Sequence, residues 1–595
     1  MSAGDYALLS DCQGAALVSR GGSVDWWSSP RFDSPSIFSR MLDPEAGHFS
    51  VRPTGDYTTE RRYLPDSMVL ESVHTATTGT VRVRDALAFA PGARGHEIGL
   101  NVSHALVRVV DAVEGRPELE IELVPRPEYG LVSPKLVRTD RGVVSVGGCE
   151  RLLVETDVEL EPQRAHAGAQ VRLAESGSVG FVLHRWQGLG SDEPDGLDPF
   201  AALENALEGW RSWAELHRSY EGEYRELVAR SALVLQALTY RPSGAVVAAA
   251  TTSLPEVPGG DSNWDYRYGW LRDSSLLARA LQTATCQDES HGYLRWMTRA
   301  ALSCASTERI GVVFGVEGER DLSERELDHL AGHEHSSPVR TGNEAWRQRQ
   351  LDVYGEVVDV AHLLREDLEE IDAQAPAFVA QLADRAAEEW DQPDSGMWEG
   401  REGERRYLHS RLMCWVALER ALDMVGELGP HAHPETWEEA KEEIRRAILD
   451  EGWHEQRGAY TGAVGSDHLD ASVLMMALVG FVDPDDERMR ATVAAIEEEL
   501  VEGGLARRYT GEEDEGAFLL VSYWLAECYA RRGDTDRARQ HFERATGCAN
   551  DLGLLAEMAV VDSGEPLGNI PQALSHVGLI NAAAAIDAAT AGRGS

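Results

Sequence analysis

The sequence of 595 residues is 43% hydrophobic and 26% charged, which is ordinary for a globular protein and, at this length, favours more than one domain. Its formal net charge of −44 excludes nucleic acid and anionic membranes as partners, because both bind basic surfaces. No apolar run approaches the roughly 18 residues of a membrane helix. The N-terminus also lacks a basic region followed by an apolar core, so we expect a cytoplasmic protein.

Cysteine use and surface charge fit that location. The seven cysteines are scattered and form no CxxC pair, which favours reduced thiols in the core over a disulfide framework or a zinc site. An acidic surface stays hydrated in a salt-rich cytoplasm, where the repulsion between its charges is screened. The same charge is compatible with GC-rich codon bias combined with an acidic surface.

Residues 1–195 have the pattern of a β-rich domain. Short runs such as SVDWW, MVLESVHTA, TVRVRDALAFA, LEIELVPRP and GSVGFVLHRW are bounded by Gly, Pro, Asp and Asn, as strands are. Repeated short strands of this kind predict a β-sandwich. Residues 196–220 contain PFAALENALEGWRSWAELH and are predicted to form a linker helix.

Residues 221–595 have the periodicity of amphipathic helices. The connections after every second helix, beginning with the first, are long, and most of the others are short. Up-and-down helices place alternate connections at one end, so the pattern predicts six helical hairpins in an (α/α)6 barrel with a decorated mouth. A helical solenoid is disfavoured because no fixed-period repeat is present. We expect helices over residues 222–240, 273–285, 290–304, 350–367, 372–388, 408–426, 435–451, 468–481, 486–501, 516–531, 534–546 and 571–588.

The long loop after the first helix carries residues suited to a sugar, in the sequence GGDSNWDYRYGWLRDSS. The loop has four aromatic residues whose flat apolar faces suit stacking on a sugar ring: Trp264, Tyr266, Tyr268 and Trp270. Arg272 and Asp273 place a hydrogen-bond donor beside an acceptor, which suits hydroxyl groups. An Arg-Asp pair is also a favourable first turn of a helix, but the aromatic density around it favours a binding role.

Two later loops supply further candidates. Arg340 follows Pro338 and is predicted to be a fixed sugar contact. Arg507 or Arg508 is predicted to bind hydroxyl groups, and the acidic residues 512–515 are interpreted as a solvated face.

Two glutamates are candidates for catalysis. Glu399 follows Trp398 in SGMWEG, and desolvation against an indole favours the protonated carboxyl group that a general acid needs. Glu557 lies in the apolar stretch GLLAEMAVV. Burying a carboxylate among apolar residues costs free energy, which favours a functional role for it. Glu565 competes with it but follows Ser-Gly on a turn and is expected to be solvated. Two carboxylates at one barrel mouth fit glycoside hydrolysis, with Glu399 as acid and Glu557 as base.

Protonation and water activation are both served by carboxylates, so the proposed chemistry requires no metal or other cofactor. The loop after the third helix contains three histidines but no helical HExxH motif. We therefore interpret them as solvated or hydrogen-bonding residues and not as metal ligands: His329, His333 and His335.

Several motifs resemble glycoside hydrolase family 15, which contains glucoamylases, glucodextranases and the bacterial and archaeal trehalases. They are YGWLRDSS, GMWEGREGERRYLHSRLMCWVALERAL, EGAFLLVSYWLAE and NDLGLLAEMAVVDSGEPLGNIPQALSHVGLIN. The stretch DYALLSDCQGAALVSRGGSVDWWSSPRFDSPSIFSRMLD resembles the N-terminal domain of the trehalase-like members. The resemblance covers nearly the whole chain. It implies a β-sandwich packed on an (α/α)6 barrel, and inverting hydrolysis of α-glucosides that releases β-glucose.

The resemblance also implies roles residue by residue. Glu399 falls on the family's acid and Glu557 on its base. The sugar contacts that it implies are Arg272 and Asp273 on the terminal glucose, Tyr266 and Trp270 beside it, and Arg508 on an outer sugar. One departure follows the base: relatives commonly carry Glu-Glu-Tyr-Asp or Glu-Gln-Tyr, and this chain has Met558 and Ala559. The departure bears on substrate preference more than on catalysis, because both carboxylates are present.

We therefore expect an inverting, exo-acting α-glucoside hydrolase, foremost a trehalase that splits α,α-trehalose into two glucoses. A glucoamylase or isomalto-oligosaccharide glucohydrolase is the alternative within this class. A phosphorylase would need a phosphate pocket in place of Glu557, and a non-catalytic sugar-binding protein would keep the cleft without turnover. Some trehalase relatives depend on phosphate and magnesium, for which the sequence shows no site. The expected partner is a small α-glucoside, and a homo-oligomer is compatible with the sequence.

Overall fold

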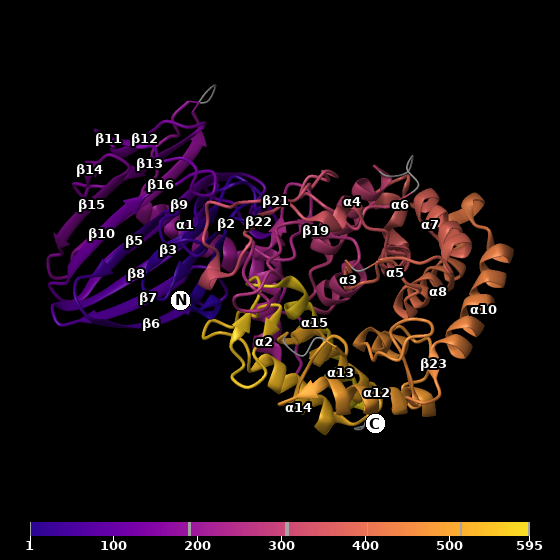
Figure 1. Cartoon of the computed structure of the whole chain (residues 1–595). Helices are drawn as coiled ribbons and strands as arrows, with labels where there is room; N and C mark the ends of the chain where they lie inside the picture. The colour runs from indigo at the N-terminus through magenta and orange to yellow at the C-terminus, as the bar shows by residue number, and fades with distance from the viewer. Residues whose placement is uncertain (1, 189–191, 304–308, 402, 512–514, 593–595) are drawn as a thin grey trace.

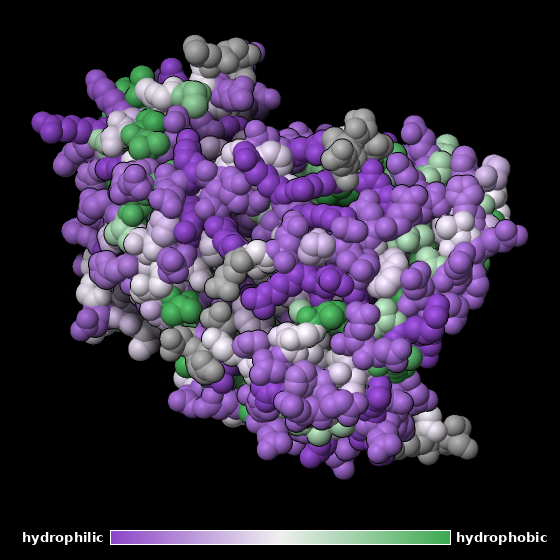
Figure 2. Space-filling view, turned by 45° about the vertical axis from the view of Figure 1, so that its right-hand side comes forward, coloured by the Kyte–Doolittle hydropathy of each residue, from purple (hydrophilic) through white to green (hydrophobic). Residues whose placement is uncertain are grey.

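Strands fill the first third of the chain and helices the remainder, and the two parts lie side by side (Figure 1). The computed structural model describes residues 2–188, 192–303, 309–401, 403–511 and 515–592. Figure 2 shows hydrophilic residues over most of one face of the molecule, with apolar residues scattered between them. Among the described residues, no helix is long and apolar enough to cross a membrane.

The strands form two eight-stranded antiparallel sheets within the described part of the chain. The first contains, in spatial order, β1 (Tyr6–Ser10), β2 (Ala15–Ser19), β3 (Ser23–Ser28), β5 (His48–Pro53), β10 (Glu118–Val124), β15 (His166–Arg172) and β14 (Glu161–Gln163), with β4 (Ser36–Phe38) paired to β3. The second contains β11 (Lys135–Thr139), β12 (Gly142–Val146), β13 (Glu150–Glu155), β16 (Ser178–Gln187), β9 (Val102–Gly115), β8 (Gly79–Phe89), β7 (Leu70–Ala76) and β6 (Tyr57–Tyr63).

The two sheets face each other across an apolar core that encloses one ion pair. Phe49 of the first sheet meets Phe181 of the second with 5.8 Å between ring centroids. Arg108 on β9 is fully buried and donates through Nε to Asp85 at 2.6 Å. Its Nη1 donates to the Gly22 carbonyl oxygen at 2.9 Å, which ties the second sheet to the first. The predicted β-sandwich is therefore confirmed.

Helix α1 (Pro199–Leu216) is present where the sequence predicts a linker helix. Asp198 caps it by accepting a hydrogen bond from the Ala201 N–H group, and a proline occupies its first turn. Its buried Trp210 packs on Phe89 of β8 with 5.4 Å between ring centroids, so the helix lies against the sandwich. The domain boundaries at residues 195 and 220 stay predictions.

Every one of the twelve predicted segments contains a helix. They are α2 (Arg225–Ala237), α3 (Ser274–Thr283), α4 (Gln287–Leu302), α5 (Asp352–Leu363), α7 (Ala375–Glu389), α8 (Leu408–Asp423), α10 (Pro434–Glu451), α11 (Met475–Leu478), α12 (Glu487–Leu500), α13 (Leu519–Arg531), α14 (Thr535–Thr546) and α15 (Ala573–Gly592). The segment predicted over 468–481 is shorter than expected, because Asp470 caps a 3-10 turn over Ala471–Leu474 before α11 begins. Two short helices, α6 (Leu368–Ile371) and α9 (Val425–Leu428), are additional.

Alternate helices form a closed inner ring. Helix α3 contacts α5, α5 contacts α8, and α8 contacts the turn that precedes α11. The ring continues from α11 to α13 and α15, and α15 returns to α3. The inner helices are enclosed by the outer ones, so most of their circumference is buried, as in α13, where Leu519–Ala530 are all buried. The predicted (α/α)6 barrel is confirmed, with the remaining helices outside this ring (Figure 1).

The sandwich and the barrel share a polar, buried contact. Trp26 of β3 donates its indole N–H to the Ala250 carbonyl oxygen at 3.1 Å. Arg267, fully buried, pairs with Asp265 at 2.7 Å. The same guanidinium donates to the Tyr129 hydroxyl at 2.8 Å and to the Ser34 carbonyl oxygen at 2.9 Å, both in the sandwich. The orientation of the barrel loop around Arg267 therefore depends on the N-terminal domain.

Two of the three loop histidines also bind the sandwich. His329 Nε2 lies 2.8 Å from the Tyr129 carbonyl oxygen, and His333 Nδ1 lies 2.8 Å from the Met41 carbonyl oxygen. This confirms the hydrogen-bonding interpretation for these two. Of the six described cysteines, five are buried and unpaired as predicted, whereas the unpaired Cys149 is exposed. Cys304 lies outside the described residues.

Candidate active site

Two adjoining cavities open at one end of the barrel. They share Tyr266, Trp398, Glu399 and Arg508 as lining residues. The inner cavity reaches the inner helices, and the outer one has a volume of about 520 Å³. The loops that follow the six outer helices all contribute lining residues: 238–273, 303–351, 390–407, 452–470, 501–518 and 547–572. The prediction that the long loops gather at one barrel mouth is confirmed.

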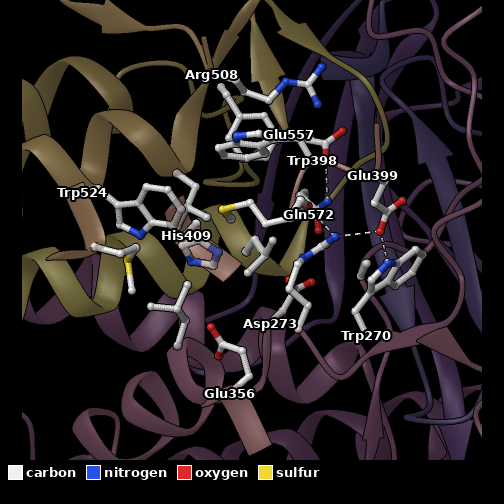
Figure 3. A pocket seen from close by; sticks show the side chains of 18 of the residues that line it. Trp270, Asp273, Glu356, Trp398, Glu399, His409, Arg508, Trp524, Glu557 and Gln572 are labelled. Atoms are coloured by element: carbon white, nitrogen blue, oxygen red, sulfur yellow. Dashed lines mark hydrogen bonds and ion pairs between the residues drawn. The ribbon is translucent and has the colours of Figure 1, made fainter. Parts of the chain in front are cut away.

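Glu399 is held at the junction of the two cavities. Its backbone is left-handed, with φ of 59°, in a turn closed by a 3.1 Å hydrogen bond from its N–H group to the Gly396 carbonyl oxygen. Its Oε1 accepts hydrogen bonds from Trp270 Nε1 at 2.6 Å and from Arg272 Nη1 at 2.7 Å (Figure 3). No protein donor to its Oε2 is found among the described residues. Both donors therefore fix one oxygen and leave the other for a ligand.

The indole that contacts Glu399 belongs to Trp270 and not to its sequence neighbour. Trp398 turns away and donates its N–H group to Asp470 Oδ1 at 2.9 Å. Its ring lies edge-on to Phe518, with 5.4 Å between centroids, and near Trp524 at 6.2 Å. The expectation that Trp398 desolvates Glu399 is thus corrected: successive side chains in this turn point to different partners, and Trp398 forms a wall of the cavity.

Glu557 faces the same inner cavity from the last long loop. It is 5% exposed, and its Oε1 accepts a 3.3 Å hydrogen bond from Gln572 Nε2. Its Oε2 is buried without a hydrogen-bond partner among the described residues. Burial raises the pKa of Glu557 well above its usual value, the charge of Glu256 raises it further, and Arg508 opposes both effects. Glu565 is exposed and lines neither cavity, which favours Glu557 of the two candidates.

Glu256 is a third carboxylate that sequence reasoning missed. It is 3% exposed and accepts a hydrogen bond from the Tyr266 hydroxyl at 3.0 Å. Arg508 Nη2 lies 3.5 Å from its other oxygen. A Cβ atom at Gly568 would lie 3.5 Å from Glu557 Oε2 and 3.8 Å from Glu256 Cγ, so the two carboxyl groups are neighbours. Burial raises the pKa of Glu256, with Arg508 opposing it.

Arg272 and Asp273 begin helix α3 and line the inner cavity. Arg272 Nε donates to Asp273 Oδ1 at 2.9 Å, and its Nη1 donates to the Met397 carbonyl oxygen at 2.7 Å as well as to Glu399. Burial raises the pKa of Asp273, and the adjacent Arg272 charge opposes that rise. Tyr266 stands edge-on to Trp270, with 5.6 Å between ring centroids. These four residues therefore surround Glu399 as one connected group.

Arg340 lies behind the cavity wall, and neither cavity has it among its lining residues. Its guanidinium packs on the ring of Trp264 at 4.5 Å and donates to the Asp261 carbonyl oxygen at 2.6 Å. Trp264 does line the outer cavity, and Arg401 covers the same ring at 4.0 Å. The expected direct sugar contact of Arg340 is therefore corrected to a support for Trp264, because Arg340 lines neither cavity and its Nη1 donates to the carbonyl oxygens of Asp261 and Asn263.

Arg508 is the arginine of its pair that reaches the site. It lines both cavities and binds Glu515 at 2.6 Å, whereas Arg507 binds Glu502 at 2.8 Å. Glu515, expected on a solvated face, instead lines the outer cavity next to Arg508. Residues 512–514 of the same acidic cluster lie outside the described residues.

Family models match both parts of the chain. The model described as glycosyl hydrolases family 15 matches residues 222–584. The chain belongs to this family. A second model, described as trehalase-like, N-terminal, matches residues 4–191. Family membership and two facing carboxylates in one cavity agree with glycoside hydrolase activity.

Relatives of this family-15 chain match nearly its whole length. A trehalase of Mycolicibacterium smegmatis is 38% identical, over 97% of this chain and 90% of that protein. A trehalase of Thermoplasma acidophilum is 32% identical, over 96% of this chain and 98% of that protein. The solved structure of a bacterial glucoamylase complexed with acarbose superposes with a TM-score of 0.74 at 14% identity, covering 98% of this chain and 94% of that one. This likeness shows a shared fold.

Other lining residues of the family-15 site carry little sequence signal. Glu256 stands in TTSLPEVPGG, where apolar neighbours and the following Pro and Gly resemble the setting of Glu557, so the same cost argument could have found it. Glu356, His409, Trp524 and Gln572 lie on or next to helices whose surroundings are apolar, and only packing shows that they face the cavity. Burial raises the pKa of Glu356 well above its usual value.

Proposed function

We propose that this chain is an inverting trehalase, which hydrolyses α,α-trehalose to two glucose molecules, with Glu399 as general acid and Glu557 as general base. The observation that supports the proposal most is that these carboxylates, from different long loops, line one cavity at the barrel mouth. Similarity to proteins described as trehalases over both parts of the chain favours trehalose over longer α-glucosides.

The contacts of Glu399 suit proton donation. Trp270 and Arg272 hold Oε1, so Oε2 is the oxygen that carries the proton to the glycosidic oxygen. The left-handed backbone of Glu399 presents the carboxyl group to the cavity in one orientation. The departing glucose takes this proton as its bond to the anomeric carbon breaks.

Glu557 has to be ionised to accept a proton from the attacking water. Burial opposes ionisation, and two neighbouring carboxylates in a buried site hold one negative charge more readily than two. Catalysis uses the form of the pair in which Glu557 carries this charge. Arg508 supports that form, because its positive charge lowers the pKa of both Glu557 and Glu256. The water, deprotonated by Glu557, attacks the anomeric carbon on the face opposite the leaving group and inverts its configuration.

The terminal glucose is assigned to the inner cavity. Arg272 engages the protein through Nε and Nη1, so Nη2 remains as a hydroxyl donor, and Asp273 Oδ2 remains as an acceptor. Tyr266 and Trp270 offer apolar ring surfaces beside them. The second glucose is assigned to the outer cavity, where Trp398 and Arg508 lie at the boundary shared by both.

The five buried, unpaired thiols support the further proposal that the protein is cytoplasmic. A glucoamylase or isomalto-oligosaccharide glucohydrolase is the second candidate, favoured by the shared fold with a bacterial glucoamylase. An outer cavity of about 520 Å³ would also admit a longer α-glucoside.

A substrate panel separates these candidates. The purified protein is incubated with trehalose, maltose or isomaltose, and the first glucose anomers are followed by proton NMR. An inverting trehalase releases α- and β-glucose in equal amounts from trehalose, because only one of the two anomeric carbons is attacked. Turnover of maltose without turnover of trehalose would replace the proposed substrate. Formation of glucose 1-phosphate in phosphate buffer would instead indicate a phosphorylase.

Three variants test the assigned roles. Glu399→Gln and Glu557→Gln are each expected to lower kcat on trehalose by about 10²–10⁴-fold, the usual contribution of a positioned acid or base. Glu565→Gln is the matched control, because Glu565 is exposed on the same loop as Glu557. Wild-type activity in either of the first two variants would remove that residue from the mechanism.

A further inference from the structure

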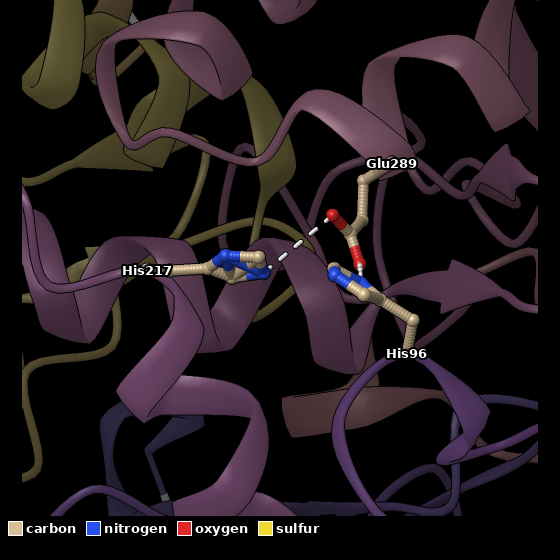
Figure 4. A group of neighbouring side chains, drawn as sticks. All are labelled: His96, His217 and Glu289. Atoms are coloured by element: carbon tan, nitrogen blue, oxygen red, sulfur yellow. Dashed lines mark hydrogen bonds and ion pairs between the residues drawn. The ribbon is translucent and has the colours of Figure 1, made fainter.

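A cluster of metal-binding side chains lies outside both cavities, where three separate segments meet. His96 belongs to a 3-10 turn over Gly95–Glu97 that connects β8 to β9 in the sandwich. His217 is the C-terminal cap of α1, and Glu289 lies in the first turn of α4 in the barrel. One potential ligand atom from each residue lies within 4.8 Å of the other two. The three side chains converge on a common point (Figure 4).

The separations between these side chains are close to those of ligands around one ion. His96 Nδ1 lies 3.2 Å from Glu289 Oε1, and His217 Nε2 lies 3.6 Å from Glu289 Oε2. Two ligand atoms that are each about 2.1 Å from a tetrahedral ion stand about 3.4 Å apart. Two separations therefore match those of a first coordination shell, and the ligand atoms of the two histidines lie within 4.8 Å of each other.

Several buried polar atoms of the cluster make no hydrogen bond to the described residues. The His217 side chain is 4% exposed, and neither of its ring nitrogens makes a hydrogen bond. Glu289 is 2% exposed in its side chain, and its Oε2, which faces His217, is also unpartnered. A buried imidazole and carboxylate left in this way are costly unless a further group satisfies them. A metal ion accepts a lone pair from each.

The surroundings orient the ligands. His96 Nδ1 donates to Glu289 Oε1 at 3.2 Å in this structure, and Asp288 Oδ2 lies 2.9 Å from His96 Nε2, where it holds the other ring proton when Nδ1 gives its lone pair to an ion. Trp213 donates its indole N–H to Glu289 Oε1 at 3.0 Å, and Arg241 Nη1 lies 3.6 Å from the same oxygen. Trp213 and Arg241 both contact Oε1 of Glu289. The other oxygen of this carboxylate, Oε2, faces His217.

We propose that His96, His217 and Glu289 bind one transition-metal ion of the zinc class. Two imidazoles and one carboxylate form a ligand set that Zn²⁺ accepts, with a water in the fourth position, whereas Mg²⁺ prefers oxygen ligands. His96 is 35% exposed in its side chain, which gives the ion a route from solvent. None of the three residues lines either cavity, so the ion ties the sandwich, α1 and α4 together and takes no part in hydrolysis.

Metal binding is measured on the full-length protein after treatment with a chelator. Added Co²⁺ is expected to give the visible absorption of a tetrahedral nitrogen and oxygen site at one equivalent. Zn²⁺ should displace it, and Mg²⁺ should not. Competition with a chromophoric chelator gives the Zn²⁺ affinity, and Zn²⁺ should raise the Tm. Absence of saturable one-equivalent binding in the wild-type protein would overturn the proposal.

Variants identify the ligands. His217→Gln and Glu289→Gln should each weaken Zn²⁺ binding by at least about 100-fold, and Asp288→Asn, which removes only the partner of His96, by about 10–100-fold. His96→Gln changes the most accessible ligand and keeps the test valid if the buried variants fold poorly. His433→Gln is the matched control, because its Nδ1 lies 2.9 Å from Asp384 in an exposed histidine–carboxylate pair elsewhere. Undiminished binding in the ligand variants, or an equal loss in the control, would contradict the assignment.

Discussion

Arg272 and Glu399 lie 127 positions apart in the sequence, and their side chains meet at 2.7 Å. The same guanidinium binds Asp273 through Nε at 2.9 Å. The residues assigned to the terminal glucose and the residue assigned to proton transfer therefore form one hydrogen-bonded unit. A glucose bound by Arg272 and Asp273 is therefore held in a fixed position relative to Glu399. Part of the binding energy is used in this way to orient the reacting bond.

A substrate with a better leaving group distinguishes the roles proposed for Glu399 and Glu557. Fluoride departs without protonation, so Glu399→Gln should retain activity on α-glucosyl fluoride within about 10-fold of wild type while losing about 10²–10⁴-fold on trehalose. Glu557→Gln should lose activity on both substrates, since each needs an activated water. Initial rates of glucose and fluoride release give the comparison. Equal losses of Glu399→Gln on the two substrates would argue against the acid role.

The acidic limb of the pH profile should depend on two neighbours of Glu557. Glu256 raises the pKa of Glu557 and Arg508 lowers it, and activity requires the ionised base. Glu256→Gln removes a like charge, so the limb of kcat/KM should move to lower pH. Arg508→Gln removes an opposing charge, so the limb should move to higher pH. Shifts of the same sign in both variants would show that the electrostatic account of this site is wrong.

The buried ion pair of Arg267 and Asp265, at the contact between sandwich and barrel, should contribute strongly to the free energy of unfolding. Arg267 and Asp265 are both fully buried, and Arg267 also binds Tyr129. Arg267→Ala leaves a buried carboxylate unpaired, which typically costs about 3–5 kcal/mol. Thermal unfolding followed by circular dichroism measures the fall in Tm. Arg347→Ala, which breaks the exposed pair with Glu344, is the control and should change stability by less than about 1 kcal/mol.

Glu527 on inner helix α13 should make stability depend on pH. Burial raises its pKa to about 7, and nearby Arg531 and Arg279 only partly oppose this. A carboxyl group whose pKa is raised on folding stabilises the fold while it is protonated. This contribution is lost as the pH rises from the pKa of the group in the unfolded chain toward 7. Glu527→Gln should therefore raise stability at pH 8, on the order of 3 kcal/mol, and change it little at pH 4. An equal effect at both pH values would exclude titration of Glu527 as the cause.

Much of the architecture follows from local sequence pattern. Apolar periodicity over about 15 residues marks a helix wherever the helix lies, because the same face must be buried. All twelve predicted helical segments contain helices, and the alternation of long and short connections identified the barrel and its functional end. The exception, at residues 468–481, arises because the Asp470 side chain caps a 3-10 turn, which apolar spacing does not reveal.

Residues of the candidate site could be predicted where a polar residue lies among apolar neighbours in the sequence. Glu557 was found because GLLAEMAVV leaves a carboxylate among apolar neighbours. Glu399 was found from its place beside Trp398, although the indole that contacts it is that of Trp270. Glu399 lines the cavity as expected, its catalytic role stays a proposal, and the indole that contacts it belongs to a different loop.

The sequence by itself determined which segments become strands and helices, and which loops carry carboxylates, arginines and aromatic rings, because these follow from spacing and composition along the chain. Only the tertiary structure decided which side chains meet. It brought Glu256 beside Glu557, turned Trp398 toward Asp470, and placed Arg340 behind Trp264. The reason is that side-chain direction and long-range packing depend on residues that are hundreds of positions apart, and on a backbone such as that of Glu399, whose left-handed turn no local pattern requires.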